Sequence, residues 1–456
     1  MKQAQNTLSI RMIKGSNILM VTLPFLLCWF GFYETRLPSL WGLEENILLL
    51  LLFAGAYSLF ARIYKAFQVS VKKVPEAIYS QTLAAILADG LIFVVNWLIN
   101  YQMPPVLPMM RVLLLQIVLT VVWTAAAHKW YFNTFPPRKT AIVFAARPGM
   151  EKLIEYYSLE RKYDVKMTLS PEECLANPQV LRSMDTVFLS GLACRERNMI
   201  LKYCILHNIQ VLLIPCIGDV ILQGSAMTHL FHLPVLAVGQ YAASPEYLLV
   251  KRLMDIFLSL TALLLLSPLM VLIALAIKLE DHGPIFYTQE RLTRDGAVFR
   301  IYKFRSMRVD AEKDGVARLS TGENDDRITK VGRIIRKLRM DELPQLLNIL
   351  QGTLSVCGPR PERPEIAAQY TEEMPEFDLR LQAKAGLTGY AQVYGQYNTS
   401  PYDKLLMDLI YIAHPSILMD LKIMLATIKV LFLPESTKGI EEGQITAQIQ
   451  EAEEHV

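Results

Sequence analysis

The sequence lacks the short motifs on which several large enzyme classes depend. It has no H-E-x-x-H, no G-x-x-x-x-G-K-[ST] and no G-x-S-x-G pattern, so zinc proteases, P-loop ATPases and serine hydrolases lack their minimal parts. Its six cysteines form no C-x-x-C pair, which argues against zinc ribbons and thioredoxin-like sites and favours free thiols in a reducing compartment. A net charge of only +3 over 456 residues does not indicate a nucleic-acid-binding protein.

Apolar residues, in contrast, are abundant and concentrated in long runs. They make up 52% of the chain, and the mean hydropathy is +0.28, both high for a soluble protein. Each of the first runs approaches the ~20 residues that a helix needs to cross a bilayer. The four runs cover roughly residues 17–32, 46–63, 78–99 and 106–127. We therefore predict a block of four transmembrane helices.

The charges between these runs predict their orientation. Basic residues precede the first run, separate the second from the third and follow the fourth, whereas the other two loops carry only Arg36. By the positive-inside rule, both ends of the block are then cytoplasmic. No small-residue cleavage site follows the first run, so we expect no cleaved signal peptide.

The pattern changes after the fourth run to short apolar segments that alternate with amphipathic ones. Strands are predicted at 140–146, 185–191 and 211–215, with helices at 150–162 and 197–209. This alternation favours a parallel sheet with Rossmann-like winding. The first strand is followed by AARPGM instead of a glycine-rich phosphate loop, so a structural, regulatory or oligomerising role is favoured over dinucleotide binding. Residues 218–239 form either a linker or a short hairpin.

A fifth apolar run, at 256–277, is long enough to span a membrane but has basic residues on both sides. Between Ile285 and Arg363 there are 16 Lys or Arg against 11 Asp or Glu. Ser267-Pro268 lies near its centre, where proline removes a backbone hydrogen bond and a serine hydroxyl can satisfy the freed carbonyl. We expect a re-entrant helix that breaks at this pair and returns to the same face; an ordinary kinked span is the alternative.

Two features of the following region suggest chemistry. The first is the adjacent pair Asp341-Glu342 in strongly basic surroundings, and the second is the rigid segment Gly358-Pro359-Arg360-Pro361. One carboxylate could attack a substrate while the other holds a metal, and the two prolines would present the Arg360 guanidinium at a fixed angle to a phosphate. A surface cluster of salt bridges would have the same composition, so the residues alone leave both readings open.

Taken in order, the motifs of this region resemble a known family. The segments GPIFYTQERLTRDGAVFRIYKFRSM, LRMDELPQLLNIL, VCGPRPERPE and KAGLTGYAQV, between Gly283 and Gln392, are similar to those of the bacterial monotopic phosphoglycosyl transferases. The four-span block and the α/β module resemble the large subgroup of that family, which includes the undecaprenyl-phosphate galactose and glucose phosphotransferases.

The resemblance implies a role for each matching residue. Asp341 would be the nucleophile that attacks the β-phosphate of a UDP-sugar, and Glu342 would coordinate Mg²⁺. UMP would leave, and undecaprenyl phosphate would take the sugar-1-phosphate from the aspartate. Further matching positions are Lys303 and Arg336 for phosphates, Arg360 between Pro359 and Pro361 for the nucleotide, Arg305 for a phosphate or as a brace for its loop, Ser267-Pro268 for the break of the membrane helix, and Lys251, Arg252 and Asp255 for its entry.

These expectations combine into a three-part chain: a membrane helical block at 1–135, a Rossmann-like module at 136–240, and a mainly helical monotopic catalytic domain at 250–456 with its re-entrant helix near 253–279. The resemblance implies the cytoplasmic membrane of a bacterium, a catalytic face in the cytoplasm, and a product that initiates exopolysaccharide, capsule or O-antigen synthesis. The identity of the sugar and self-association as a homo-oligomer are left open.

Two alternatives belong to other classes. A membrane glycosyltransferase would transfer the sugar alone and release UDP, but its usual D-x-D metal motif is absent, since Asp326 directly follows Asp325. A non-catalytic scaffold of polysaccharide assembly would suit the first 240 residues. The intact carboxylate pair and the Gly358–Pro361 segment argue against a scaffold for the whole chain.

Overall fold

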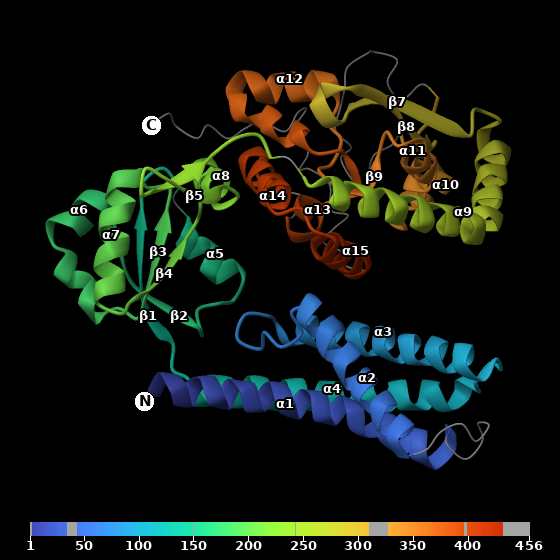
Figure 1. Ribbon diagram of the computed structural model, residues 1–456, viewed down its shortest axis with the longest axis horizontal. Helices are drawn as coiled ribbons and strands as arrows, with labels where there is room; N and C mark the ends of the chain where they lie inside the picture. Colours follow the sequence, from blue (N-terminus) through green and yellow to red (C-terminus); the bar gives the residue numbers. More distant parts are fainter. Residues whose placement is uncertain are drawn as a thin grey trace. The chain divides into compact units, whose positions relative to one another are not determined.

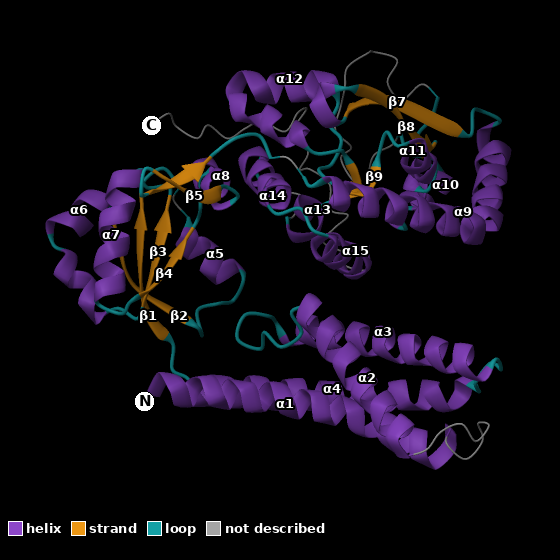
Figure 2. Cartoon of the chain, in the orientation of Figure 1, coloured by secondary structure: helices purple, strands orange, loops and turns teal. Residues whose placement is uncertain are grey.

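The computed structural model describes residues 2–33, 43–147, 149–241, 243–309, 327–395 and 399–431. The chain divides into two compact units, one up to Ile214 and the other from Pro215 onward. Figure 1 shows the order of the elements, and Figure 2 shows that helices predominate, with one sheet of several strands in the first unit. Asp325 and Asp326 lie outside the described residues.

The first unit begins with a bundle of long helices that matches the four predicted runs. Each is long and apolar enough to cross a membrane. Their interior is partly polar: Tyr57 donates to Asn17 Oδ1 at 2.7 Å, and Asn17 Nδ2 donates to Gln81 Oε1 at 2.9 Å. The helices are α1 (Lys2–Cys28, extended by a π-helical turn at Trp29–Tyr33), α2 (Leu43–Ile63), α3 (Val74–Asn100) and α4 (Val106–Thr134).

The predicted parallel sheet follows the bundle, with one strand more than expected. Its strands are β1 (Arg138–Phe144), β2 (Tyr163–Leu169), β3 (Thr186–Ser190) and β4 (Gln210–Leu213), in the order β2-β1-β3-β4 and all parallel. Strand β2 was not predicted from the sequence, because its apolar residues alternate with polar ones and it is only partly buried. The helix expected at 150–162 is shorter, since α5 is Met150–Tyr156. The buried faces of β1 and β3 form one core with α7 (Cys194–Leu206).

The second unit begins with α8 (Ile217–Gln223) and an antiparallel hairpin of β5 (Ala226–Leu230) and β6 (Leu233–Ala237). Of the two alternatives for residues 218–239, the hairpin is correct for residues 226–237, whereas residues 218–223 form most of α8, which was not predicted. Ile217 and Val220 of α8 lie in the main core of this unit, so α8 packs with the C-terminal residues.

The fifth apolar run forms α9 (Pro245–Asp281), a helix of 37 residues that is also long and apolar enough to span a membrane. The helix is continuous through Ser267-Pro268, where a break was expected, and Figure 1 shows it as two legs that meet at a sharp bend. A proline inside a helix is the usual cause of such a bend. Ser267 Oγ donates to the carbonyl of Leu264 at 3.0 Å. That carbonyl is the acceptor which the missing N–H of Pro268 leaves without its helical partner, so the serine compensates the proline.

Charged residues attach the first leg of α9 to the rest of the unit. Lys251 forms a buried ion pair with Asp420 at 2.9 Å, and Arg252 donates to two carbonyl oxygens in the last turn of α11 (Gln345–Gln351) at 2.6 and 2.7 Å. The Asp255 carboxylate accepts from the hydroxyl of Ser355 and the backbone of the next residue in β9 (Ser355–Cys357), at 2.8 and 3.0 Å. These side chains bind protein groups, which explains why charges occur in an otherwise apolar helix.

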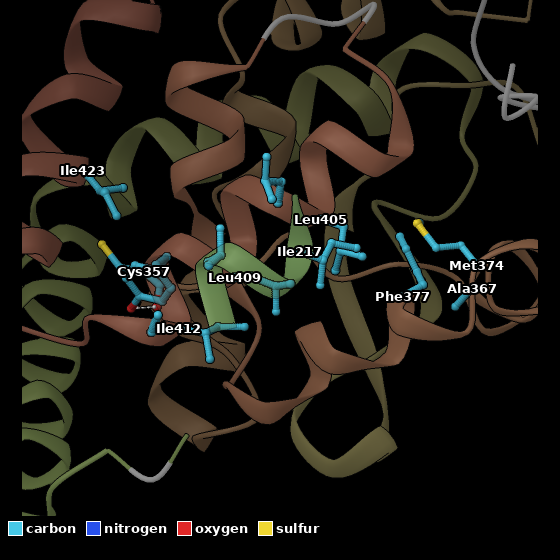
Figure 3. Close-up of a cluster of buried hydrophobic side chains, with 13 residues drawn as sticks. Ile217, Cys357, Ala367, Met374, Phe377, Leu405, Leu409, Ile412 and Ile423 are labelled. Atoms are coloured by element: carbon cyan, nitrogen blue, oxygen red, sulfur yellow. Dashed lines mark hydrogen bonds between the residues drawn. The ribbon is translucent and has the colours of Figure 1, made fainter. Parts of the chain in front are cut away.

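The remaining elements surround a core to which α14 contributes most. Leu405, Leu409 and Ile412 repeat at helical spacing and point inward together with Cys357 and Phe377 (Figure 3). The elements are β7 (Phe286–Leu292), β8 (Val298–Phe304), α10 (Lys330–Lys337), α11 (Gln345–Gln351), β9 (Ser355–Cys357), α12 (Pro364–Glu373), β10 (Gly386–Thr388), α13 (Tyr390–Tyr394), α14 (Pro401–Ala413) and α15 (Ile417–Leu431).

Candidate active site

The antiparallel β7–β8 hairpin places Lys303 beside the start of α11. Phe299 and Ile301 of β8 are buried against Ile349 of α11. Asn348 then fixes the edge of β8, because its Nδ2 donates to the carbonyl of Arg300 and its Oδ1 accepts from the backbone N–H of Tyr302, both at 2.9 Å. This buried amide replaces a neighbouring strand, so the position of β8 relative to α11 is tightly defined.

The carboxylate pair lies in a short turn between α10 and α11. Arg339 adopts the left-handed conformation, with φ 52° and ψ 24°, and ends the helix before the 3₁₀ turn Met340–Glu342. Met340 and Leu343 pack against the core formed by Ile335 and the second leg of α9. The apolar residues on either side of the turn thus hold it in place, and its two carboxylates come from a backbone that is anchored at both ends.

Glu342 is surrounded by cations. Its Oε1 lies 3.1 Å from Lys303 Nζ and 3.6 Å from Arg360 Nη2. Burial alone would raise the pKa of Glu342, but the charges of Lys303, Arg360 and Arg339 outweigh it and hold that pKa below its usual range. Glu342 is therefore a carboxylate at neutral pH and is suited to hold a cation.

The pKa of Asp341 is shifted in the opposite direction. Burial and the neighbouring charge of Glu342 raise its pKa above the ordinary aspartate range, against the lowering effects of Lys303 and Arg336. Two adjacent carboxylates with pKa values pushed apart are typical of active sites, where one group stays ionised and the other is more basic and more nucleophilic.

The Gly358–Pro361 segment crosses β10 closely. A Cβ on Gly358 would collide with the carbonyl oxygen of Lys384, and one on Gly386 would collide with the backbone of Gly358. Gly358 N donates to Thr388 O at 2.9 Å, so the two backbones are bonded as well as adjacent. This crossing explains the glycine before the first proline and leaves the Arg360 side chain 46% exposed.

These elements line a cleft of about 260 Å³, open to solvent, in which four of the predicted residues meet. Lys303, Glu342, Arg360 and Pro361 line it, and Arg336 is close enough for its charge to act on Asp341. The other lining residues are Arg291, Ile301, Gln345, Gly386 and Leu387. Such a concentration of cationic side chains favours the binding of an anionic substrate.

Four predicted residues lie elsewhere. Pro359 lines a neighbouring pocket of about 320 Å³, and Ser267 and Pro268 belong to α9. Arg305 is buried; its Nε donates to the carbonyl of Pro284 at 2.7 Å, and its other nitrogens bind the Asp281 carboxylate. Of the two roles considered for Arg305, this geometry favours the brace for its loop over a phosphate contact.

Arg291 and Gln345 line the cleft but were not among the residues predicted from the sequence. The register of the hairpin pairs Arg291 with Phe299, so Arg291 shares a face with Ile301 and Lys303. Alternation along an antiparallel pair was thus a signal that could have identified Arg291 once Lys303 was singled out. Gln345 begins α11 directly after the carboxylate turn, and no local pattern distinguishes it from a helix-capping residue.

The oxygen donors of the turn fit a magnesium ion that is shared with a substrate. Within the described ranges, no three His, Cys, Asp or Glu side chains converge as a closed metal site. Mg²⁺ typically needs only one or two carboxylates when phosphate oxygens and waters complete its octahedron. Glu342, kept ionised beside Lys303 and Arg360, supplies such a carboxylate on the wall of the cleft.

Comparison with known proteins extends these observations. Residues 246–434 match the family model described as bacterial sugar transferase. The chain is 41% identical over 203 residues to the exopolysaccharide production protein PSS of Rhizobium leguminosarum bv. phaseoli, and the match covers 42% of this chain and 98% of that protein.

Two longer relatives carry more specific names. The UDP-N-acetylgalactosamine-undecaprenyl-phosphate N-acetylgalactosaminephosphotransferase of Aeromonas hydrophila is 38% identical over 239 residues, which are 52% of this chain and 55% of that protein. The UDP-glucose:undecaprenyl-phosphate glucose-1-phosphate transferase of Escherichia coli (strain K12) is 38% identical over 223 residues, 48% of each chain. The matched part thus spans about half the length of these two relatives.

Proposed function

The chain belongs to the bacterial sugar transferases, and from this premise we propose that it transfers a hexose-1-phosphate from a UDP-sugar to undecaprenyl phosphate and releases UMP. The observation that carries the proposal is the cleft in which Glu342 lies between Lys303 and Arg360, directly beside Asp341. Relatives whose names include undecaprenyl-phosphate sugar transfer support the donor and acceptor classes.

In the proposed first step, a carboxylate oxygen of Asp341 attacks the β-phosphorus of the UDP-sugar. The bond between that phosphorus and the bridging oxygen breaks, and the electron pair leaves with UMP. Asp341 then carries the sugar-1-phosphate as an acyl phosphate. In the second step, a phosphate oxygen of undecaprenyl phosphate attacks the same phosphorus, which frees Asp341 and forms the diphosphate-linked sugar. A covalent intermediate divides one difficult displacement into two easier ones.

The cations of the cleft account for how a carboxylate could attack an anionic diphosphate. Lys303 and Arg360 offset the charge of the phosphate oxygens, and Arg336 lies close enough to stabilise ionised Asp341. Mg²⁺ bound through Glu342 would supply further charge neutralisation on the diphosphate. The raised pKa of Asp341 makes it the stronger nucleophile of the pair, whereas the lowered pKa of Glu342 suits a metal ligand.

For the membrane arrangement, we propose that α9 enters the bilayer, bends at Ser267-Pro268 and returns to the cytoplasmic face. Leu264, Leu265 and Leu272 near the bend are exposed, as a lipid-facing surface requires. The basic residues on both sides of the helix support a common cytoplasmic side. Undecaprenyl phosphate, a membrane lipid, would then approach the cleft from the bilayer, and the product would initiate a surface polysaccharide.

The decisive experiment identifies the nucleotide that is released. Protein purified in detergent is incubated with undecaprenyl phosphate, Mg²⁺ and UDP-glucose, UDP-galactose or their N-acetylated forms. We expect UMP from one donor sugar, its loss in Asp341→Asn, and its retention in Asp295→Asn, a control in an exposed turn whose left-handed conformation asparagine tolerates.

The outcome also separates the alternatives. Release of UDP would indicate an ordinary glycosyltransferase. The absence of either nucleotide with every sugar, from protein that keeps its helical circular dichroism, would indicate a scaffold. Undiminished UMP release by Asp341→Asn would refute the proposed nucleophile.

A further inference from the structure

The segment that carries Arg360 is held at four consecutive carbonyl oxygens. Pro359 O accepts from Gly386 N at 2.9 Å, and Arg360 O accepts from Arg380 Nη2 at 2.9 Å. Pro361 O accepts from Arg291 Nη1 at 3.1 Å, and Glu362 O accepts from the backbone N–H of Leu292 at 2.9 Å. Four donors from three parts of the fold, two of them on β7, therefore define this short backbone.

The bond to the carbonyl of Arg360 itself differs from the others, because its donor is held by a buried charge. Arg380 Nη2 lies 2.8 Å from Asp408 Oδ2, and the two side chains are only 8% and 2% exposed. The Arg380 guanidinium also lies over the ring of Phe377, 4.8 Å from its centroid, so its plane is fixed by packing as well as by charge. Arg380 has little freedom to follow Arg360 if that residue moves.

Asp408 belongs to α14, the helix whose apolar face forms the centre of the core. Burial raises the pKa of Asp408 to about 6, and the Arg380 guanidinium at 2.8 Å opposes this rise and favours the carboxylate form. A buried ion pair adds little stability over an apolar pair of the same size, and in some proteins such pairs specify one geometry. Here the pair fixes the donor to the backbone of Arg360, which lines the cleft.

We propose that Asp408 and Arg380 are positioning residues, which act through the backbone of Arg360 to aim its guanidinium at the diphosphate of the donor. This inference rests on the proposed function. Asp408 does not line the cleft, and Arg380 lines only the neighbouring pocket. Their effect on the reaction is therefore indirect and concerns the donor, because it is the diphosphate of the donor that the Arg360 guanidinium would bind.

The test measures KM separately for the two substrates. Asp408→Asn keeps the shape of the side chain and removes its charge, whereas Arg380→Lys keeps a cation opposite Asp408 but loses the planar donor shared with the Arg360 carbonyl. Because a displacement of about 1 Å can cost about 100-fold in rate, we expect each variant to raise the KM for the UDP-sugar about 10-fold. The KM for undecaprenyl phosphate should stay unchanged. Asp403→Asn, a control at the capped start of α14, should change neither KM.

A purely structural role is distinguished by a double-mutant cycle with Arg360→Lys. If Asp408 and Arg380 act through Arg360, then adding either substitution to Arg360→Lys should raise the KM for the UDP-sugar much less than it does in the wild-type background. Equal effects in both backgrounds would overturn the inference, and so would an unchanged KM in the single variants.

Folding and the proposed function are controlled separately. All assays are run well below the lowest melting temperature of the series, and if Asp408→Asn fails to fold, Arg380→Lys carries the same cycle. Wild-type protein that releases no UMP with any sugar would refute the proposed function. Active wild-type protein with unaffected variants would refute the positioning role alone.

Discussion

The buried ion pair between Lys251 and Asp420 allows a quantitative prediction about how α9 is attached. Lys251 Nζ lies 2.9 Å from Asp420 Oδ2, and the two side chains are 10% and 0% exposed. Asp420 also accepts from the hydroxyls of Tyr247 and Tyr411, at 3.0 and 2.8 Å. Removing one partner leaves the other charge buried and uncompensated, which typically costs about 3–5 kcal/mol.

We therefore expect Lys251→Met and Asp420→Asn each to destabilise the protein by about 3 kcal/mol or more. At about 2–4 °C per kcal/mol for a unit of this size, the melting temperature should fall by roughly 6 °C or more. The double variant contains no unpaired charge, so its loss should be smaller than the sum of the single losses by at least about 1 kcal/mol.

The assay is thermal unfolding in detergent, followed by circular dichroism at one fixed scan rate, since unfolding of a membrane protein can be irreversible. Arg300 and Glu290 offer a matched control in the same unit, 3.8 Å apart but 73% and 58% exposed. Neutralising either should change stability by at most about 0.5 kcal/mol. Losses at Lys251 and Asp420 that simply add, or that equal those of the exposed pair, would refute the reasoning.

Three further predictions concern the site and the bend. Gly358→Ala should lower the melting temperature and UMP release, because its methyl group collides with backbone and overpacking costs about 1–3 kcal/mol, whereas Gly239→Ala, with open space around it, should do neither. Lys303→Met removes a charge that lowers the pKa of Asp341, so that pKa should rise and the acidic limb of the kcat/KM profile should move to higher pH by about 1 unit. An acidic limb that does not move would contradict the assignment of Asp341 as the nucleophile. Ser267→Ala leaves a carbonyl at the bend unpaired, and we expect a loss of about 1 kcal/mol in thermal unfolding, with no loss if water replaces the hydroxyl.

Much of the organisation was accessible from the sequence because it depends on local properties. Hydrophobic length predicted the four helices of the first unit, and alternation of short apolar runs predicted the parallel sheet. The edge strand β2 was not predicted, since its apolar residues are only partly buried and leave a weak apolar signal. The hydrogen bond that Pro268 removes and the Ser267 hydroxyl that replaces it lie within one turn of helix, so local sequence is enough to expect both, whereas the re-entrant course of α9 stays a prediction.

The sequence by itself also supplied the candidates for the chemistry, through its motifs and their resemblance to a known family: the carboxylate pair at Asp341-Glu342, the cations Lys303 and Arg336, and the proline-flanked Arg360. Their roles stay predictions. Their convergence was decided only by the tertiary structure, because β8, the carboxylate turn and the Gly358–Pro361 segment are far apart along the chain. The fold also assigned Arg305 to a buried contact with Asp281 and brought Asp408 of α14 behind Arg360 through Arg380. Residue type and spacing encode local geometry and candidate chemistry, whereas burial, pKa and the partner of each charge arise when distant segments pack together.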